Sequence, residues 1–246
     1  MENNLTVLTG AGGSLGKALC KRLIEEKHHV VAILKPHGTE IPYSTHNQII
    51  SLKMDLANTI DYKAVSETVE SLCRRSRYSQ LNLIHTAAIF RKQRIDFPCT
   101  SKEISEIFQV NCVSVYTITQ TLLPWFRKVN NGTIIGISSN LTKRVNSNTS
   151  IYTASKYALE GLIKQLAYEL GRYNTRCNII APGYFRSNMS LPLPKQKINE
   201  IKLKTPLGRI GTTADIVQSI LLLLSSNAKW VTGQTILSDG GNSLGF

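Results

Sequence analysis

The sequence lacks most marks of a secreted, metal-binding or membrane protein. Its five cysteines are scattered, odd in number and without a CxxC pair, so we expect reduced thiols and no metal site. No apolar run approaches the roughly 18 residues that a membrane-spanning helix needs. The N-terminal MENN leads into an apolar run without a charged and then hydrophobic leader. These absences predict a cytoplasmic protein with no membrane partner.

Nucleic-acid-binding signatures are also missing, although basic residues dominate. Lysine and arginine number 29 against 16 acids, which gives a formal net charge of +13. The basic residues are spread along the chain, and the densest clusters, at 74–77 and 91–94, are short. A helix-turn-helix, a zinc finger and an RNA-binding motif are not found. The charge therefore favours a phosphate-bearing cofactor and an anionic substrate as partners, with no nucleic acid.

Apolar runs alternate with helical patterns over all 246 residues, of which 42% are hydrophobic. The continuous run VVAIL at 30–34 is typical of a strand buried on both faces of a parallel sheet. We expect strands at 5–9, 30–34, 49–54, 81–86, 133–138, 177–181 and 235–237. We expect helices up to about 27 and at 61–73, 102–129, 151–172 and 213–224, with Pro124 bending or restarting the third and Thr212 or Thr213 capping the last. This alternation predicts an α/β fold, a Rossmann-type doubly wound seven-stranded parallel sheet, as a single domain over 1–246.

The stretch 184–204 interrupts the alternation, because it contains prolines and no clear period. It starts at the carboxyl end of a predicted strand, where ligands bind in such sheets. A segment of this length is more often functional than not. We predict a substrate-binding flap, with Met189, Leu191 and Leu193 as apolar walls and Lys195 and Lys197 nearby.

A glycine-rich stretch, TGAGGSLG, follows the first predicted strand. Its glycines fit the spacing GxxGxxG, with Gly10, Gly13 and Gly16. Glycine lets the backbone approach a pyrophosphate, which the N-terminus of a helix beginning near Ser14 would bind. The plainer alternative is a turn that only joins a strand to a helix.

Tyr152 and Lys156 lie four residues apart on a predicted helix and so share one face. A nearby ammonium favours phenolate and would lower the pKa of Tyr152, making it a general acid or base near neutral pH. YxxxK is a common pattern, but this helix follows Ser139 at the end of a predicted strand. Ser139 either binds a substrate oxygen or forms a turn.

Three further polar residues have two or more interpretations. Asn111, inside a predicted helix, is a satisfied core amide, a helix kink or a residue that holds water. Asp55 either accepts a bond from an adenine amino group or caps a turn. The second strand ends at Lys35, where NAD-preferring folds place an acid for the ribose hydroxyl. Lysine there favours NADP(H) over NAD(H).

Together these motifs resemble the short-chain dehydrogenase/reductase family along essentially the whole chain. HTAA at 85–88 stands where that family has NNAG, and Asn111, Ser139, Tyr152 and Lys156 have the spacing of its catalytic tetrad. APG at 181–183, PLGRIG at 206–211 and VTGQTILSDGG at 231–241 resemble its C-terminal signatures. The overall pattern is most similar to 3-oxoacyl-carrier-protein reductases.

The resemblance implies a role for each of these residues. Tyr152 would exchange a proton with the carbinol oxygen, Ser139 would position the carbonyl, and Asn111 would hold a water. Lys156 would lower the pKa of Tyr152 and bind the nicotinamide ribose. The expected cofactor-binding residues are Gly10, Gly12, Gly13, Ser14, Leu15, Lys35, Asp55, Leu56, Ala87, Ala88, Tyr152, Lys156, Pro182, Phe185 and Ser187. The family also implies a homotetramer or homodimer built on the predicted helices at 102–129 and 151–172 and on the last strand.

The chain departs from the family pattern at two motifs. Ser14 replaces a glycine, so the loop matches the family's longer, sugar-nucleotide-modifying branch, which this chain is too short to join. His85, Thr86 and Ala88 alter NNAG, and we interpret His85 as a hydrogen-bonding residue at a strand end.

We expect an NADP(H)-dependent oxidoreductase that transfers hydride between nicotinamide and a carbonyl or secondary alcohol. Candidate substrates are 3-oxoacyl thioesters, carrier-linked or free, and anionic small molecules. The alternative from a different class is a regulatory protein that binds a dinucleotide without catalysis.

Overall fold

The computed structural model describes residues 3–38, 40–58, 62–187 and 193–244. Seven strands form one parallel sheet in the order β3-β2-β1-β4-β5-β6-β7. The strands are β1 (Asn4–Thr9), β2 (His28–Leu34), β3 (Ile49–Lys53), β4 (Gln80–His85), β5 (Gly132–Ile137), β6 (Thr175–Pro182) and β7 (Thr235–Ser238). The predicted doubly wound Rossmann-type fold is thereby confirmed, and most strand ends differ from the predicted ones by only a residue or two.

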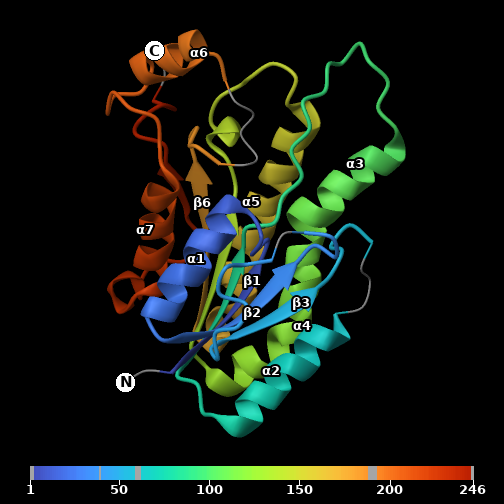
Figure 1. Cartoon of the computed structure of the whole chain (residues 1–246), viewed down its shortest axis with the longest axis vertical. Coiled ribbons are helices and arrows are strands. Elements are labelled where there is room, and N and C mark those ends of the chain that lie inside the picture. Colours follow the sequence, from blue (N-terminus) through green and yellow to red (C-terminus); the bar gives the residue numbers. More distant parts are fainter. Residues whose placement is uncertain (1–2, 39, 59–61, 188–192, 245–246) are drawn as a thin grey trace.

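Helices cover both faces of the sheet (Figure 1). On one face, α1 (Ser14–Glu25) and α7 (Thr213–Leu224) pack on alternate residues of the central strands, such as Leu8, Ile84 and Ile135. On the other, α2 (Lys63–Arg75), α4 (Ser114–Val129) and α5 (Ser150–Leu170) pack on the residues between them. The inner strands are covered by helices on both faces, which explains their continuous hydrophobic runs in the sequence, whereas the edge strands β3 and β7 are partly exposed.

The predicted long helix at 102–129 is interrupted, but not at Pro124. α3 (Ser101–Phe108) passes into a π-helical segment at Gln109–Val113, which continues directly into α4. Pro124 lies inside α4, which runs on without a restart. A π segment adds a residue to a turn and marks functional sites in many helices, and this one contains Asn111.

The stretch 184–204 is only partly irregular. Its second half forms the helix α6 (Lys195–Leu203), which the sequence analysis did not predict. Lys195 and Lys197 are exposed on α6, and Leu193 is half-buried just before it. Met189 and Leu191 lie outside the described residues. Figure 1 shows α6 close to the C-terminus, at the end of the molecule away from α2.

Side-chain caps fix the starts of two helices. Thr100 and Glu103 form a reciprocal capping box at α3, and Thr212 and Asp215 form another at α7. Thr212 is therefore the cap of α7. Within the described ranges, no helix combines the length and the apolar character needed to cross a membrane.

Candidate active site

The predicted site residues follow the carboxyl ends of the strands. Because all strands are parallel, these ends meet at one edge of the sheet, where ligands bind in folds of this kind. The turn after β1 and the start of α1 carry Gly10 to Leu15. The loop after β2 carries Lys35, the loop after β3 carries Asp55 and Leu56, and the loop after β4 carries Ala87 and Ala88. Pro182 ends β6, and Phe185 and Ser187 follow it. Ser139 follows β5, and Tyr152 and Lys156 lie on the first turns of α5.

The glycine turn is shaped by close backbone approaches. Gly10 has a φ of 68°, and a Cβ added there would lie 2.6 Å from the Ala87 nitrogen. A Cβ on Gly16 would lie 2.3 Å from the Gly10 carbonyl oxygen. The turn leads into α1, whose N-cap residue, Gly13, provides no side-chain cap. A helix N-terminus behind a tight glycine turn fits a dinucleotide pyrophosphate, because backbone N–H groups and the helix dipole favour an anion there.

Ser139, Tyr152 and Lys156 are brought together. The Ser139 side chain acts on the phenol of Tyr152, whose pKa it lowers, and Ser139 Oγ accepts from the Leu141 backbone N–H at 3.2 Å. Lys156 is 1% exposed, and its Nζ lies 5.6 Å from the Tyr152 ring centre. The ammonium donates to the Ile137 carbonyl oxygen at 2.8 Å. Ser139 thus both stabilises the turn after β5 and lowers the pKa of Tyr152.

Burial affects both charged forms at this site. It raises the pKa of Tyr152 to about 12, and the Ser139 side chain acts in the opposite direction. Burial also lowers the pKa of Lys156 to about 7, which the nearby Cys112 opposes. Desolvation disfavours both charges, and the prediction that Lys156 lowers the pKa of Tyr152 stays a prediction. Burial favours the neutral form of the Tyr152 phenol.

Asn111 is a fully buried, fully bonded amide. Its Oδ1 accepts from the Ile89 N–H at 2.7 Å, and its Nδ2 donates to the Ile89 carbonyl at 3.0 Å and to Ser155 Oγ at 2.9 Å. Ser155 in turn donates to the Tyr152 carbonyl at 2.6 Å. Two of the three interpretations of Asn111 therefore apply at once: it is a satisfied core amide, and it lies in a distorted stretch of helix.

His85 links two parts of the site as a neutral ring. Burial, assisted by the charge of Lys156, lowers the pKa of His85 to about 3. Its Nε2 lies 3.0 Å from the Val110 carbonyl, which can only accept, so Nε2 carries the hydrogen. Nδ1 then accepts from Thr9 Oγ1 at 2.8 Å. The interpretation of His85 as a hydrogen-bonding residue at a strand end is confirmed.

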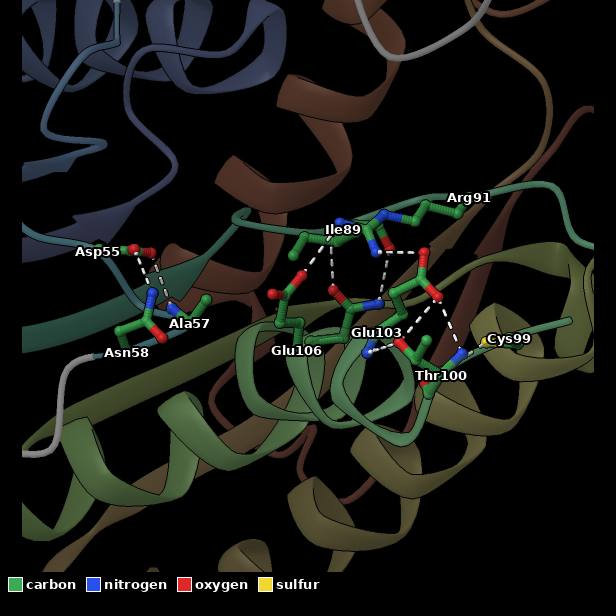
Figure 2. Close-up of polar contacts among 10 residues, drawn as sticks. Asp55, Ala57, Asn58, Ile89, Arg91, Cys99, Thr100, Glu103 and Glu106 are labelled. Carbon is green, nitrogen blue, oxygen red and sulfur yellow. Dashed lines mark hydrogen bonds and ion pairs between the residues drawn. The ribbon is translucent and has the colours of Figure 1, made fainter.

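Asp55 and Lys35 stand apart from this cluster. Asp55 caps a turn, with its carboxylate accepting from the Ala57 N–H at 3.0 Å and from Asn58 Nδ2 at 2.7 Å, as Figure 2 shows. Lys35 is exposed directly after β2. Phe185 bridges to Gly211, which ties the start of the predicted flap to the segment before α7.

Phe90 and Arg91 are site residues that the sequence analysis missed. The ring of Phe90 lies edge-on to that of Tyr152, with 4.8 Å between the centres. Arg91 pairs with Glu106 at 3.0 Å and with Glu103 at 3.6 Å, and these contacts lie beside Ile89 in Figure 2. Their position just after β4 was a usable signal, because that strand end is part of the ligand edge.

The C-terminal turn contacts the loop that carries Ser139. Asn140 Nδ2 donates to Asn242 Oδ1 at 3.2 Å and lies 3.4 Å from an Asp239 carboxylate oxygen. Arg144 bonds to the Asn242 carbonyl at 3.4 Å. Asn242 also donates to the Lys204 carbonyl at 3.2 Å, so this turn joins the catalytic loop to the end of α6.

A Rossmann-type sheet with a glycine turn after β1 and a buried tyrosine–lysine pair on α5 defines a dinucleotide-dependent oxidoreductase. A family model described as enoyl-(acyl carrier protein) reductase matches residues 10–243. The chain belongs to the short-chain dehydrogenase/reductase family. It is an NAD(P)-dependent oxidoreductase that acts on CH–OH or C=O groups.

Known proteins resemble the chain over nearly its whole length. It is 28% identical to a 3-oxoacyl-(acyl-carrier-protein) reductase of Thermotoga maritima, covering 98% of both chains. It is 27% identical to a 3alpha-hydroxysteroid dehydrogenase of Mediterraneibacter gnavus, covering 98% of this chain and 97% of the other. A 4-hydroxyisoleucine dehydrogenase complexed with NADH superposes with a TM-score of 0.87 at 26% identity, covering 99% of this chain and all of that one.

Proposed function

We propose that this protein reduces an anionic carbonyl compound with NADP(H), using Tyr152 as the proton donor. The grouping of Ser139 with the buried Tyr152 and Lys156 carries the proposal, because it brings together a carbonyl-binding hydroxyl and a protonated phenol. Short-chain reductases of 3-oxoacyl carrier proteins are among the similar proteins, which makes 3-oxoacyl thioesters a candidate substrate class.

In the proposed mechanism, Lys156 would help to hold a nicotinamide cofactor, which would supply the hydride when bound. Ser139 Oγ donates to the substrate oxygen and holds it near the phenol. Tyr152, kept neutral by burial, donates its proton to that oxygen as the carbonyl is reduced. Lys156 would bind the cofactor's ribose, and Asn111, which holds the Ile89 backbone, would also hold a water in a proton relay.

The cofactor would lie across the carboxyl edge of the sheet. The turn at Gly10–Leu15 would hold the pyrophosphate, Asp55 and Leu56 the adenine, and Ala87 and Ala88 the adjacent ribose. Pro182, Phe185 and Ser187 would contact the nicotinamide. Lys35 supports the preference for NADP(H), because an exposed cation after β2 suits a 2′-phosphate. Similar solved structures contain NADH, so both cofactors belong in the test.

The stretch 184–204 would close over the substrate, and its exposed Lys195 and Lys197 suit an anionic group. The net charge of +13 also suits an acidic carrier protein.

We further propose a homotetramer or homodimer that packs through α4, α5 and β7. Exposed apolar side chains on these elements, such as Tyr116, Tyr157 and Leu237, support that assembly. A cytoplasmic location fits the five free thiols.

Tyr152→Phe tests the proposed function. The variant should still bind NADPH, seen as quenching of protein fluorescence, but reduce acyl thioesters and small ketones at least about 100-fold more slowly, because proton transfer is lost. Tyr168→Phe, an exposed tyrosine on the same helix, is the control and should behave as wild type. Undiminished turnover by Tyr152→Phe would refute the role of Tyr152. Binding of NADPH without turnover by the wild type would favour a regulatory protein.

A further inference from the structure

Glu160 is a largely buried carboxylate on the helix that carries Tyr152 and Lys156. The three residues are spaced by four, so they lie along one face of α5. The Glu160 side chain is only 11% exposed. A buried carboxylate requires partners that compensate for lost hydration, and these partners show what Glu160 holds in place.

The partners of Glu160 come from the loop after β5. Ser138 Oγ donates to Glu160 Oε1 at 2.7 Å, and Thr142 Oγ1 lies 2.7 Å from the same oxygen. Lys143 Nζ lies 3.5 Å from Oε2. Ser138 and Thr142 are 3% and 1% exposed, so water does not compete for these bonds.

These contacts flank Ser139 on both sides. The Thr142 hydroxyl also lies 2.9 Å from the Ser139 carbonyl, so its single hydrogen is shared between that oxygen and Glu160. Two neighbours of Glu160 on α5 bond the same loop, Lys156 at the Ile137 carbonyl and Tyr157 at the Thr142 carbonyl. The loop is therefore fixed to α5 before and after Ser139.

We propose that Glu160 is a positioning residue, which sets the Ser139 hydroxyl against the Tyr152 phenol by holding Ser138 and Thr142. The role rests on the proposed function, since it acts through two residues assigned there. Ser139 and Tyr152 lie on different elements, and Glu160 joins these elements with bonds that end one residue before Ser139 and three residues after it.

The consequence for catalysis follows from the effect of Ser139 on Tyr152. Burial raises the pKa of the Tyr152 phenol, and the Ser139 side chain acts to lower it. The other titratable groups around the pair are Lys156, Cys112 and His85, while Lys143 is the ion-pair partner of Glu160 itself. A displaced Ser139 would therefore leave the pKa of Tyr152 higher still, and a misplacement of about 1 Å can slow catalysis about 100-fold.

Two variants, Glu160→Ala and Glu160→Gln, distinguish a positioning role of Glu160 from a role in protein stability alone. The alanine variant should lower kcat about 10- to 100-fold with little change in KM, and should move the pH profile of alcohol oxidation to higher pH. Glutamine keeps an oxygen that accepts from Ser138 and Thr142, so Glu160→Gln should restore most of the rate and the wild-type profile. Glu169→Ala, an exposed glutamate on α5, is the matched control.

A double variant tests the same contacts from the other side. Ser138→Ala with Thr142→Val removes the donors and leaves Glu160 in place, so it should reproduce the shifted pH profile. An unshifted profile in Glu160→Ala, or a failure of Glu160→Gln to restore the rate, would overturn the proposal. Thermal unfolding and NADPH binding are measured alongside. If the wild type binds NADPH and turns over no carbonyl or alcohol, the proposed function fails and the positioning role fails with it.

Discussion

At the scale of single residues, the site depends on backbone positions that only glycine can occupy. Gly10 combines a left-handed φ of 68° with a backbone nitrogen 2.6 Å from where its Cβ would be. Neither the strain nor the contact can be relieved by a side-chain rotation, because the neighbouring atoms belong to the Ala87 backbone. The sequence indicated a glycine turn but not which glycine is required by its neighbours.

Gly10→Ala should lower the free energy of unfolding by at least about 2 kcal/mol, from left-handed strain and the contact with Ala87. Gly171→Ala is the matched control, because Gly171 has a helical φ of −54° and open space around it. That change should stabilise the protein by about 0.5 kcal/mol. Calorimetric unfolding of both variants measures the difference, and equal melting temperatures would contradict the assigned strain.

At the scale of elements, the segment after β4 is held by several separate anchors. Asn111 binds the backbone of Ile89 on both sides, Arg91 pairs with two glutamates of α3, and the Gln93 N–H donates to the Asn148 carbonyl at 2.8 Å. Phe90 lies between the first two anchors and contacts Tyr152. The segment thus shapes the space beside the phenol.

Arg91→Met should raise KM for the carbonyl substrate several-fold and change kcat less, because the segment shifts while Tyr152 stays on α5. The melting temperature should change little, since the Arg91 side chain is 40% exposed and such pairs contribute about 1 kcal/mol or less. Arg94→Met is the control, because Arg94 pairs with Asp96 inside the same segment. Identical KM values for the two variants would refute the role of Arg91 in anchoring this segment.

Most elements of this fold could be predicted from periodicity, because buried parallel strands leave continuous apolar runs. The π segment could not be, since QVNCV has the composition of an ordinary helix and its distortion arises from the bonds of Asn111 to Ile89. Pro124 does not restart the helix, because α4 continues through it from Ser114 to Val129. α6 carries few buried residues, so its sequence has no apolar stripe to detect.

The candidate site was predictable where a residue follows a strand and has a functional side chain, as for Ser139 and Tyr152. The raised pKa of Tyr152 could not be predicted, because desolvation depends on how deeply the phenol is packed. Glu160 was missed because a glutamate on a helix is usually exposed, and only the fold places Ser138 and Thr142 beside it.

At the scale of the whole molecule, buried histidines couple stability to pH. His28 lies at the amino-terminal edge of the sheet, 4% exposed, with Nδ1 at 2.8 Å from Thr6 Oγ1, and burial lowers its pKa to about 4. Between pH 6.5 and 4 the unfolded chain binds a proton that the folded chain does not. The free energy of unfolding should therefore fall by up to about 3 kcal/mol over this range.

His28→Gln should make the melting temperature less dependent on pH between 7 and 4.5, because the glutamine does not titrate. A remaining slope is expected, since His85 is also buried and neutral. His37→Gln, at an exposed position, should keep the full slope of the wild type. Parallel curves for all three proteins would show that His28 contributes nothing to acid sensitivity.

The turn that joins Asn242 to Asn140 has a practical consequence for handling the protein. We expect a purification tag or fluorescent reporter attached beyond Asn242 to disturb a turn bonded to the residue next to Ser139. β1 begins at the opposite edge of the sheet, far from α6 in Figure 1. A fusion partner placed before β1 should therefore change the kinetic constants less than one placed beyond this turn.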